Sequence, residues 1–254
     1  MNIFKNNRFA PKEPLDARRI ALVSEKGGVA KTSTAASIAL SLYDRGYNVR
    51  AYDLDSNRSL TERFRMREEL DGSCPITQSM EASSNIRNSR IKRAIKEEME
   101  VREDDFLIID TGGQKSMSTI EVVTAPELDL VIIPTTSSYD DLHVTYETMK
   151  ALEESLFAYN ERTQVALYQV KVATNAKTSM RNDFLEHVEL WAEQDPEFGD
   201  KYFVLNSFST QRKSYTELSR VGCSIEGYTN DRGQKDEVAI RELHELIYEI
   251  SGIK

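Results

Sequence analysis

Residues 24–33 read S-E-K-G-G-V-A-K-T-S and have the composition of a loop that binds phosphate. Gly27 and Gly28 let backbone N–H groups approach phosphate oxygens closely, and the helix expected next adds its positive end. Lys31 is placed to reach the outer phosphates of a nucleotide, and the hydroxyl of Thr32 is a ligand for Mg²⁺. This stretch therefore predicts nucleotide binding with magnesium.

The loop departs from the common phosphate-binding spacing, G-x-x-x-x-G-K-[ST]. Glu25 and Ala30 stand where that spacing has glycines, and the glycines are instead adjacent. A second lysine, Lys26, stands in front of them at the mouth of the loop. The ordinary chemistry of a phosphate loop gives this lysine no role.

Acidic residues end two further apolar runs. The stretch Y-D-L-D-S-N carries Asp53 and Asp55, and L-I-I-D-T-G-G carries Asp110 followed by Gly112 and Gly113. Such carboxylates can hold the water shell of Mg²⁺ or orient an attacking water, and a glycine backbone can sense a terminal phosphate. Alone, a D-x-D at a strand end is typical of a helix cap or a solvated turn. Together with the loop, these acids predict Mg-assisted phosphoryl transfer.

Strands and helices alternate along the whole chain. A buried strand at 19–24 precedes the glycine loop, a helix follows at 32–45, and the next strand lies at 48–55. This alternation predicts a doubly wound, mostly parallel α/β sheet with helices on both faces, since parallel strands need crossover connections. We expect a polar N-terminal arm at 1–18 and a single domain at 19–254. Further strands are expected at 105–113, 128–136, 164–175 and 202–207, and further helices at about 87–100, 139–158, 181–194, 211–220 and 236–251.

Bulk composition narrows the class of protein. The 254 residues are 39% hydrophobic and carry a net charge of −9, so any DNA contact must come from local basic patches. No apolar run is long enough to span a membrane, and the N-terminus lacks a secretory signal. Cys74 and Cys223 are far apart and outside any C-x-x-C, which favours a reducing cytoplasm over a disulfide or metal scaffold.

From about residue 19 to 250, the chain resembles the ParA/MinD family of deviant Walker A P-loop ATPases. The resemblance is carried by K-G-G-V-A-K-T-S, by D-L-D about twenty residues later and by I-I-D-T-G-G. Members of that family dimerise face to face on ATP. The resemblance implies that Lys26 reaches across the interface to a phosphate of the partner's nucleotide, while Lys31 serves the nucleotide of its own chain.

The resemblance also implies roles for individual residues. Asp55 would position the hydrolytic water, Asp53 would support the loop or the Mg²⁺ shell, and Asp110 would hold the metal through water. Asn175 matches a position that often contacts adenine. The family commonly has D-x-D-P-Q where this chain has D-L-D-S-N, so the turn after Asp55 is expected to differ. The nucleotide-binding set is then Lys26, Gly27, Gly28, Val29, Ala30, Lys31, Thr32, Ser33 and Asn175, and the metal set is Thr32, Asp53 and Asp110.

Branches of the family differ in what the ATP-bound dimer holds. Partition ATPases coat non-specific DNA and are stimulated by a centromere-binding protein. Some carry an N-terminal helix-turn-helix domain, which we do not expect before the ATPase domain here. MinD-like members hold the membrane through a basic amphipathic C-terminal helix. Here the C-terminal helix has an apolar stripe backed mostly by glutamates, which favours packing in the core over anionic lipid.

A DNA-partition role needs a basic surface. The candidate DNA contacts are Arg212, Lys213, Arg220 and Arg241, although a solvated face is an equally ordinary reading of such a run. A second basic patch, Arg87, Arg90, Lys92 and Arg93, could bind a partner protein instead. We therefore expect a cytoplasmic, nucleoid-associated partition ATPase that dimerises on ATP and Mg²⁺. The alternative is a ParA-like adaptor that positions a protein complex with little DNA binding. A reductase of the nitrogenase iron-protein type is rejected, because the two cysteines do not supply its cluster ligands.

Overall fold

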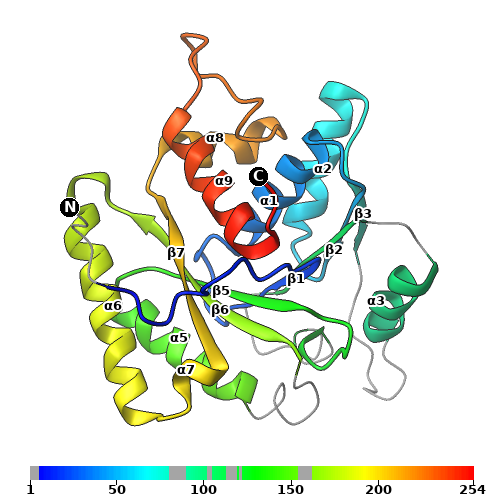
Figure 1. Cartoon of the computed structure of the whole chain (residues 1–254). Coiled ribbons are helices and arrows are strands. Elements are labelled where there is room, and N and C mark those ends of the chain that lie inside the picture. Colours follow the sequence, from blue (N-terminus) through cyan, green and yellow to red (C-terminus); the bar gives the residue numbers. More distant parts are fainter. Residues whose placement is uncertain (1–5, 80–89, 102–104, 113–118, 120–121, 154–161) are drawn as a thin grey trace.

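The central sheet contains seven strands in the part of the chain that is described, and every pair is parallel (Figure 1). Their order is β3-β2-β4-β1-β5-β6-β7. The computed structural model describes residues 6–79, 90–101, 105–112, 119, 122–153 and 162–254. The strands are β1 (Arg19–Leu22), β2 (Val49–Asp53), β3 (Ile76–Ser79), β4 (Phe106–Asp110), β5 (Leu130–Thr135), β6 (Gln164–Val172) and β7 (Tyr202–Thr210).

Helices cover both faces of the sheet, each above its own hydrophobic cluster. One face carries α1 (Lys31–Asp44), α2 (Ser59–Asp71), α8 (Lys213–Val221) and α9 (Glu237–Ser251). The other carries α3 (Arg90–Val101), α5 (Tyr139–Leu152), α6 (Lys177–Gln194) and the short α7 (Phe198–Lys201). Within the described ranges, no helix combines the length and the apolar character needed to cross a membrane.

The predicted doubly wound α/β fold is confirmed. A strand covered on both faces must be apolar throughout, and β4, F-L-I-I-D, is buried at every position. The prediction omitted α2, β3 and the short α7, and α6 begins at Lys177 rather than at residue 181. The expected start of one helix at 87 and the expected end of another at 158 lie outside the described residues.

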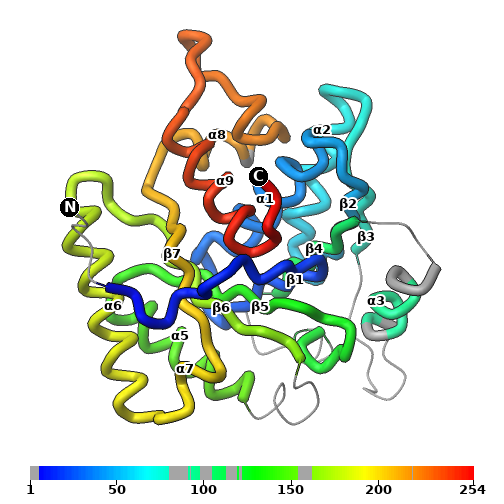
Figure 2. The backbone as a smooth tube through the Cα atoms, viewed as in Figure 1, coloured from blue at the N-terminus to red at the C-terminus, as the bar shows by residue number. Residues whose placement is uncertain are grey.

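The described part of the N-terminal arm, residues 6–18, packs along β7 and α9 (Figure 2). The backbone N–H groups of Leu15 and Ala17 donate to carbonyls at the end of α9, at 3.0 and 2.9 Å. Phe9 accepts from the N–H of Val204 at 3.0 Å, and its ring packs edge-on against Phe198. These contacts cover part of β7, which is the edge strand of the sheet on that side.

Two helices on the α1 face, α2 and α8, meet through their backbones. Gly222, which ends α8, has a φ of 62°, and a Cβ added to it would lie 2.6 Å from the backbone nitrogen of Arg67 in α2. The Arg67 side chain in turn donates to Asp44, the last residue of α1, at 2.7 Å. The helix that follows the phosphate loop, α2 and α8 are therefore packed in series.

The strand register aligns the ends from which the predicted site residues project. Asp110 is the register partner of Asp53 on one side and of Leu22, the last residue of β1, on the other. Parallel strands all end at the same edge of a sheet, which is where doubly wound proteins bind ligands. The glycine loop and the acids at the ends of β2 and β4 therefore meet at this edge.

Candidate nucleotide site

The glycine loop connects β1 to α1 by two left-handed backbone steps. Gly28 has a φ of 80°, and Ala30, directly before the first residue of α1, has a φ of 61°. The carbonyl of Ala30 accepts the first helical hydrogen bond, from the N–H of Thr34 at 2.8 Å. Lys31 follows as the first residue of the helix, and its side chain is buried. The loop thus turns the start of α1 toward the carboxyl edge of the sheet.

Ala30 occupies a conformation that favours glycine, and this gives a stability prediction. A left-handed φ costs a residue with a Cβ about 1–2 kcal/mol. Replacement of Ala30 by glycine would remove this cost, but the greater chain entropy of glycine in the unfolded state offsets about 0.4–1 kcal/mol of the gain in stability. Ala30→Gly is expected to raise the free energy of unfolding by about 0.5–1 kcal/mol, measured by urea denaturation.

The matched control for that change is Ala35→Gly, in the buried interior of α1. It removes the same methyl group from an ordinary helical conformation and is expected to lower the stability by about 1 kcal/mol. Destabilisation of similar size by both substitutions would show that the left-handed backbone at Ala30 carries no strain.

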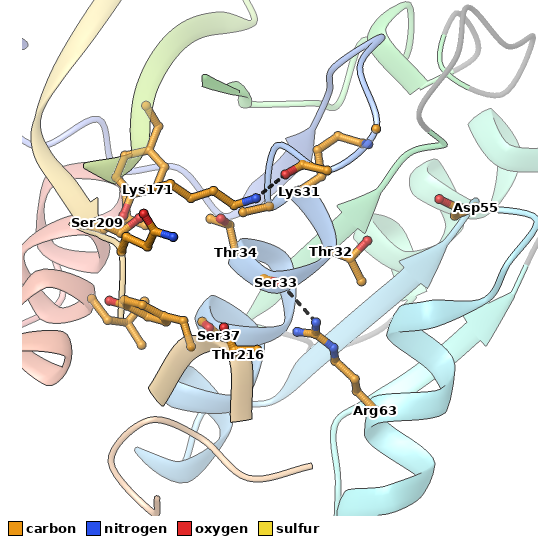
Figure 3. A pocket seen from close by; sticks show the side chains of 18 of the residues that line it. Lys31, Thr32, Ser33, Thr34, Ser37, Asp55, Arg63, Lys171, Ser209 and Thr216 are labelled. Atoms are coloured by element: carbon orange, nitrogen blue, oxygen red, sulfur yellow. Dashed lines mark hydrogen bonds between the residues drawn. The ribbon is translucent and has the colours of Figure 1, made fainter. Parts of the chain in front are cut away.

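A large cavity of about 970 Å³ opens beside the loop (Figure 3). Its walls come from the loop and the first turns of α1, from the segment after β2, from α2, and from the ends of β6 and β7 together with α8. Figure 3 shows Thr32 and Ser33 on α1, with Asp55 and Arg63 arriving from the α2 side. The cavity is lined by polar residues beside the loop and also by Tyr168 of β6 and Leu246 of α9.

Asp53 and Asp55 differ in what their carboxylates hold. Asp53 is fully buried and accepts from both the N–H and the hydroxyl of Thr61, at 2.8 and 2.9 Å. Asp55 is half-buried, accepts from the N–H of Asn57 at 2.9 Å and lines the cavity. The structure therefore shows Asp53 fixing the start of α2. Of the two acids, Asp55 is the one that lines the cavity.

Asp110 is a buried carboxylate without a hydrogen-bond partner on either oxygen in the described part of the chain. Burial raises its pKa to about 7, and the charges of Asp53 and Asp55 act in the same direction, while Thr32 and Lys31 oppose them. An orphaned carboxylate that close to the loop suits a hydrated divalent cation, because carboxylate oxygens and water are the ligands that Mg²⁺ prefers. Thr32 and Asp110 therefore fit a magnesium site.

Lys26, the second lysine of the loop, forms an ion pair within its own chain. Its ammonium group contacts the carboxylate of Asp141, in the first turn of α5. The side chain of Lys26 keeps 37% of its surface exposed, and the other Asp141 oxygen accepts from the hydroxyl of Thr136. Neither Lys26 nor Asp141 is among the residues that line the cavity.

Two further side chains that the sequence did not single out form hydrogen bonds with residues 24–33. Lys171, at a register irregularity in β6 and with a φ of 56°, donates from its ammonium group to the carbonyl of Gly28 at 2.5 Å. Arg63 donates to the hydroxyl of Ser33 at 3.0 Å. Asn175, the predicted adenine contact, is exposed in the 3₁₀ helix η3 (Thr174–Ala176) and is not among the residues lining the cavity.

The predicted DNA contacts fall into two groups. Arg212 is half-buried, lines the cavity and pairs with Asp236 at 3.1 Å. Lys213 and Arg220 on α8 are 78% and 72% exposed, and each lies within 4.0 Å of Glu217. Arg241 is exposed on α9. Only Lys213 and Arg220 therefore share an exposed face of one helix.

The second basic patch is described only in part. Arg93 on α3 is 71% exposed and lies 3.6 Å from Glu97. Arg87 lies outside the described residues, as do the side chains of Arg90 and Lys92. The described structure therefore places only one of the four side chains of this patch.

Comparison with known proteins gives one family and a consistent fold. The model of the CobQ/CobB/MinD/ParA nucleotide binding domain matches residues 20–230. The chromosome-partitioning ATPase Soj of Thermus thermophilus is 26% identical over 198 residues, which cover 67% of this chain and 78% of Soj. MinD of Aquifex aeolicus superposes with a TM-score of 0.65 at 15% identity, over 94% of this chain and 98% of MinD. The ParA of pNOB8 bound to nonspecific DNA gives 0.61 at 16% identity, over 94% of this chain and all of that one.

Proposed function

Because this chain belongs to the CobQ/CobB/MinD/ParA family of nucleotide-binding domains, we propose that it is a ParA-like ATPase that segregates DNA. In this proposal, two copies dimerise on ATP and Mg²⁺, bind DNA without sequence preference and release it after hydrolysis. The observation that carries the proposal is the cavity itself, in which the glycine loop, Lys31 and Asp55 face one space large enough for a nucleotide.

The residues around the loop divide the binding of ATP among them. Backbone N–H groups at Gly27 and Gly28 and the start of α1 receive the phosphates, and Lys31 neutralises their charge. Thr32 and Asp110 would hold Mg²⁺, which would supply positive charge beside the outer phosphates. Val29, Ala30 and Ser33 complete the loop around the nucleotide.

Hydrolysis needs a water in line with the terminal phosphate, and Asp55 is placed to orient it. Its carboxylate is anchored by the N–H of Asn57 and lines the cavity, while Asp53 fixes the helix that follows. Positioning of this kind supplies most of the catalysis in phosphoryl transfer. We expect turnover to be slow until a centromere-binding protein or another partner stimulates it.

The DNA surface of the proposed dimer is the exposed face of α8. Lys213 and Arg220 present their cationic groups to solvent there, and Arg241 supplies a further exposed cation on α9. Soj, a relative by sequence, is a chromosome-partitioning ATPase, and the structure of pNOB8 ParA was determined on nonspecific DNA. A nucleoid-associated protein in the cytoplasm follows from this reading.

A second function is favoured by one observation on the same face. Glu217 lies between Lys213 and Arg220 and offsets part of their charge. Such a mixed surface suits a protein partner at least as well as a polyanion. The alternative is therefore a ParA-like adaptor that positions a protein complex and binds DNA little.

Binding to random-sequence duplex DNA separates the two functions. The full chain is titrated with ATP, with ADP and without nucleotide, at two salt concentrations. Partition predicts binding with ATP alone, with an affinity that falls steeply as salt rises, because phosphate contacts release counterions. Absence of DNA binding under every condition would support the adaptor.

Charge reversal on α8 locates the DNA surface. The pair Lys213→Glu and Arg220→Glu is expected to weaken ATP-dependent DNA binding at least tenfold and to lower the salt slope by about 1 for each lost contact. The matched control reverses two exposed cations elsewhere, Lys12 and Arg65, and is expected to bind as the wild type does. Equal loss in both double variants would show that net charge, rather than this face, decides the affinity.

A further inference from the structure

Three arginines of α2 differ in their partners. Arg65 pairs with Glu62 and Glu69, and Arg67 pairs with Asp44 and Asp71, all within 3.0 Å. Among the described residues, no carboxylate oxygen lies within 4.0 Å of the Arg63 guanidinium, the distance that defines an ion pair. Arg63 is therefore the arginine of this helix whose charge lacks a close counterion in the described structure.

The partner that Arg63 does have is neutral. One of its terminal nitrogens donates to the hydroxyl of Ser33 at 3.0 Å, and the guanidinium lines the cavity beside the loop. Burial lowers the pKa of Arg63, and the charge of Asp110 offsets only part of that shift. A half-buried cation held by a hydroxyl leaves several of its five donors for a ligand that carries negative charge.

The position of Arg63 is fixed rather than incidental. Asp53 holds the first turn of α2 through Thr61, and the neighbouring Phe64 is buried in the core. Ser33 lies in the first turn of α1, where backbone N–H groups point toward any bound anion. Arg63 thus reaches the first turn of α1, directly after the glycine loop, from the neighbouring helix α2 (Figure 3).

We propose that Arg63 binds phosphate oxygens of the nucleotide, as a cation supplied by the same chain in addition to Lys31. This inference rests on the proposed function, because it needs a nucleoside di- or triphosphate in the cavity. A guanidinium can donate two parallel hydrogen bonds to phosphate, which fixes orientation as well as charge. Arg63 exchanges its hydroxyl partner for phosphate and so links α2 to the nucleotide.

Nucleotide affinity of single variants tests the assignment. Dissociation constants for ATP and ADP are measured with the full chain at several salt concentrations. Arg63→Ala is expected to weaken both nucleotides about 10- to 100-fold and to reduce the slope of log Kd against log salt. Arg63→Lys is expected to recover the salt slope but only part of the affinity, since the charge remains and the fork is lost. Arg65→Ala, the exposed neighbour on the same helix, is the matched control with wild-type affinity.

The outcomes distinguish a failure of this inference from a failure of the proposed function. Wild-type protein that binds neither nucleotide would remove the proposed function and this inference together. Wild-type binding with unchanged affinity in Arg63→Ala would overturn the inference alone. A weaker affinity that the lysine variant does not improve, with a lower melting temperature of the nucleotide-free protein, would assign Arg63 a purely structural role and also overturn it.

Discussion

Replacement of Lys26 by alanine is expected to abolish ATP-dependent dimerisation while monomers still bind ATP within about twofold of the wild-type affinity. A symmetric dimer would lose the contact twice, once at each nucleotide. Charge-assisted hydrogen bonds contribute about 1.5–3 kcal/mol each, so the dimer should weaken about 100-fold or more. Sedimentation with ATP and Mg²⁺ measures the dimer, and nucleotide titration at low protein concentration measures the monomer.

The intramolecular pair with Asp141 supplies a sharper comparison. Asp141→Asn removes the charge that holds Lys26 in its own chain but keeps the lysine. A lysine that acts across the interface should leave this variant able to dimerise, in contrast to Lys26→Ala. Lys235→Ala, at an exposed lysine, controls for loss of one positive charge. Dimerisation of Lys26→Ala equal to that of the wild type would refute the role given to the second lysine.

Replacement of Lys31 by alanine is expected to weaken nucleotide binding itself. The side chain is buried at the start of α1 and would face the phosphates inside the cavity, where water screens charge poorly. Removal of one partner from such a pair costs about 2–5 kcal/mol, so the ATP affinity should fall at least about 30-fold. Calorimetric titration with ATP and Mg²⁺ measures this loss.

The two lysine variants control for each other. Lys26→Ala should retain monomer binding, and Lys31→Ala should lose it, although both remove one ammonium group from the same loop. Lys31→Met keeps the length of the buried chain without its charge and should resemble the alanine variant. Normal ATP affinity in Lys31→Ala would contradict the assignment of the loop as the phosphate site.

Most strands could be predicted because parallel strands are buried on both faces and read as continuous apolar runs. The helix α2 escaped prediction because only Leu60 and Phe64 of its thirteen residues are buried, so no apolar stripe marks it. The strand β3, I-T-Q-S, is short and partly exposed at the edge of the sheet, with neither alternation nor a run to identify it. Elements that pack with little apolar surface leave little pattern in a sequence.

The residues of the candidate site also differ in how far the sequence predicts them. The loop could be predicted because its chemistry lies in consecutive residues from Lys26 to Ser33. Arg63 and Lys171 reach that loop only through the fold, one from a helix that was not predicted and the other from a strand irregularity. The intrachain partner of Lys26 is likewise a property of tertiary structure, since Asp141 is more than a hundred residues away.

The contact at Gly222 has a mechanical consequence. With no side chain between the end of α8 and the backbone of α2, the two helices are in direct backbone contact, and a larger residue at position 222 would have to push them apart. A displacement of α2 that follows the gain or loss of a terminal phosphate would therefore carry the cations of α8 with it. The contact at Gly222 would then transmit movement from the nucleotide cavity to the exposed cations of α8.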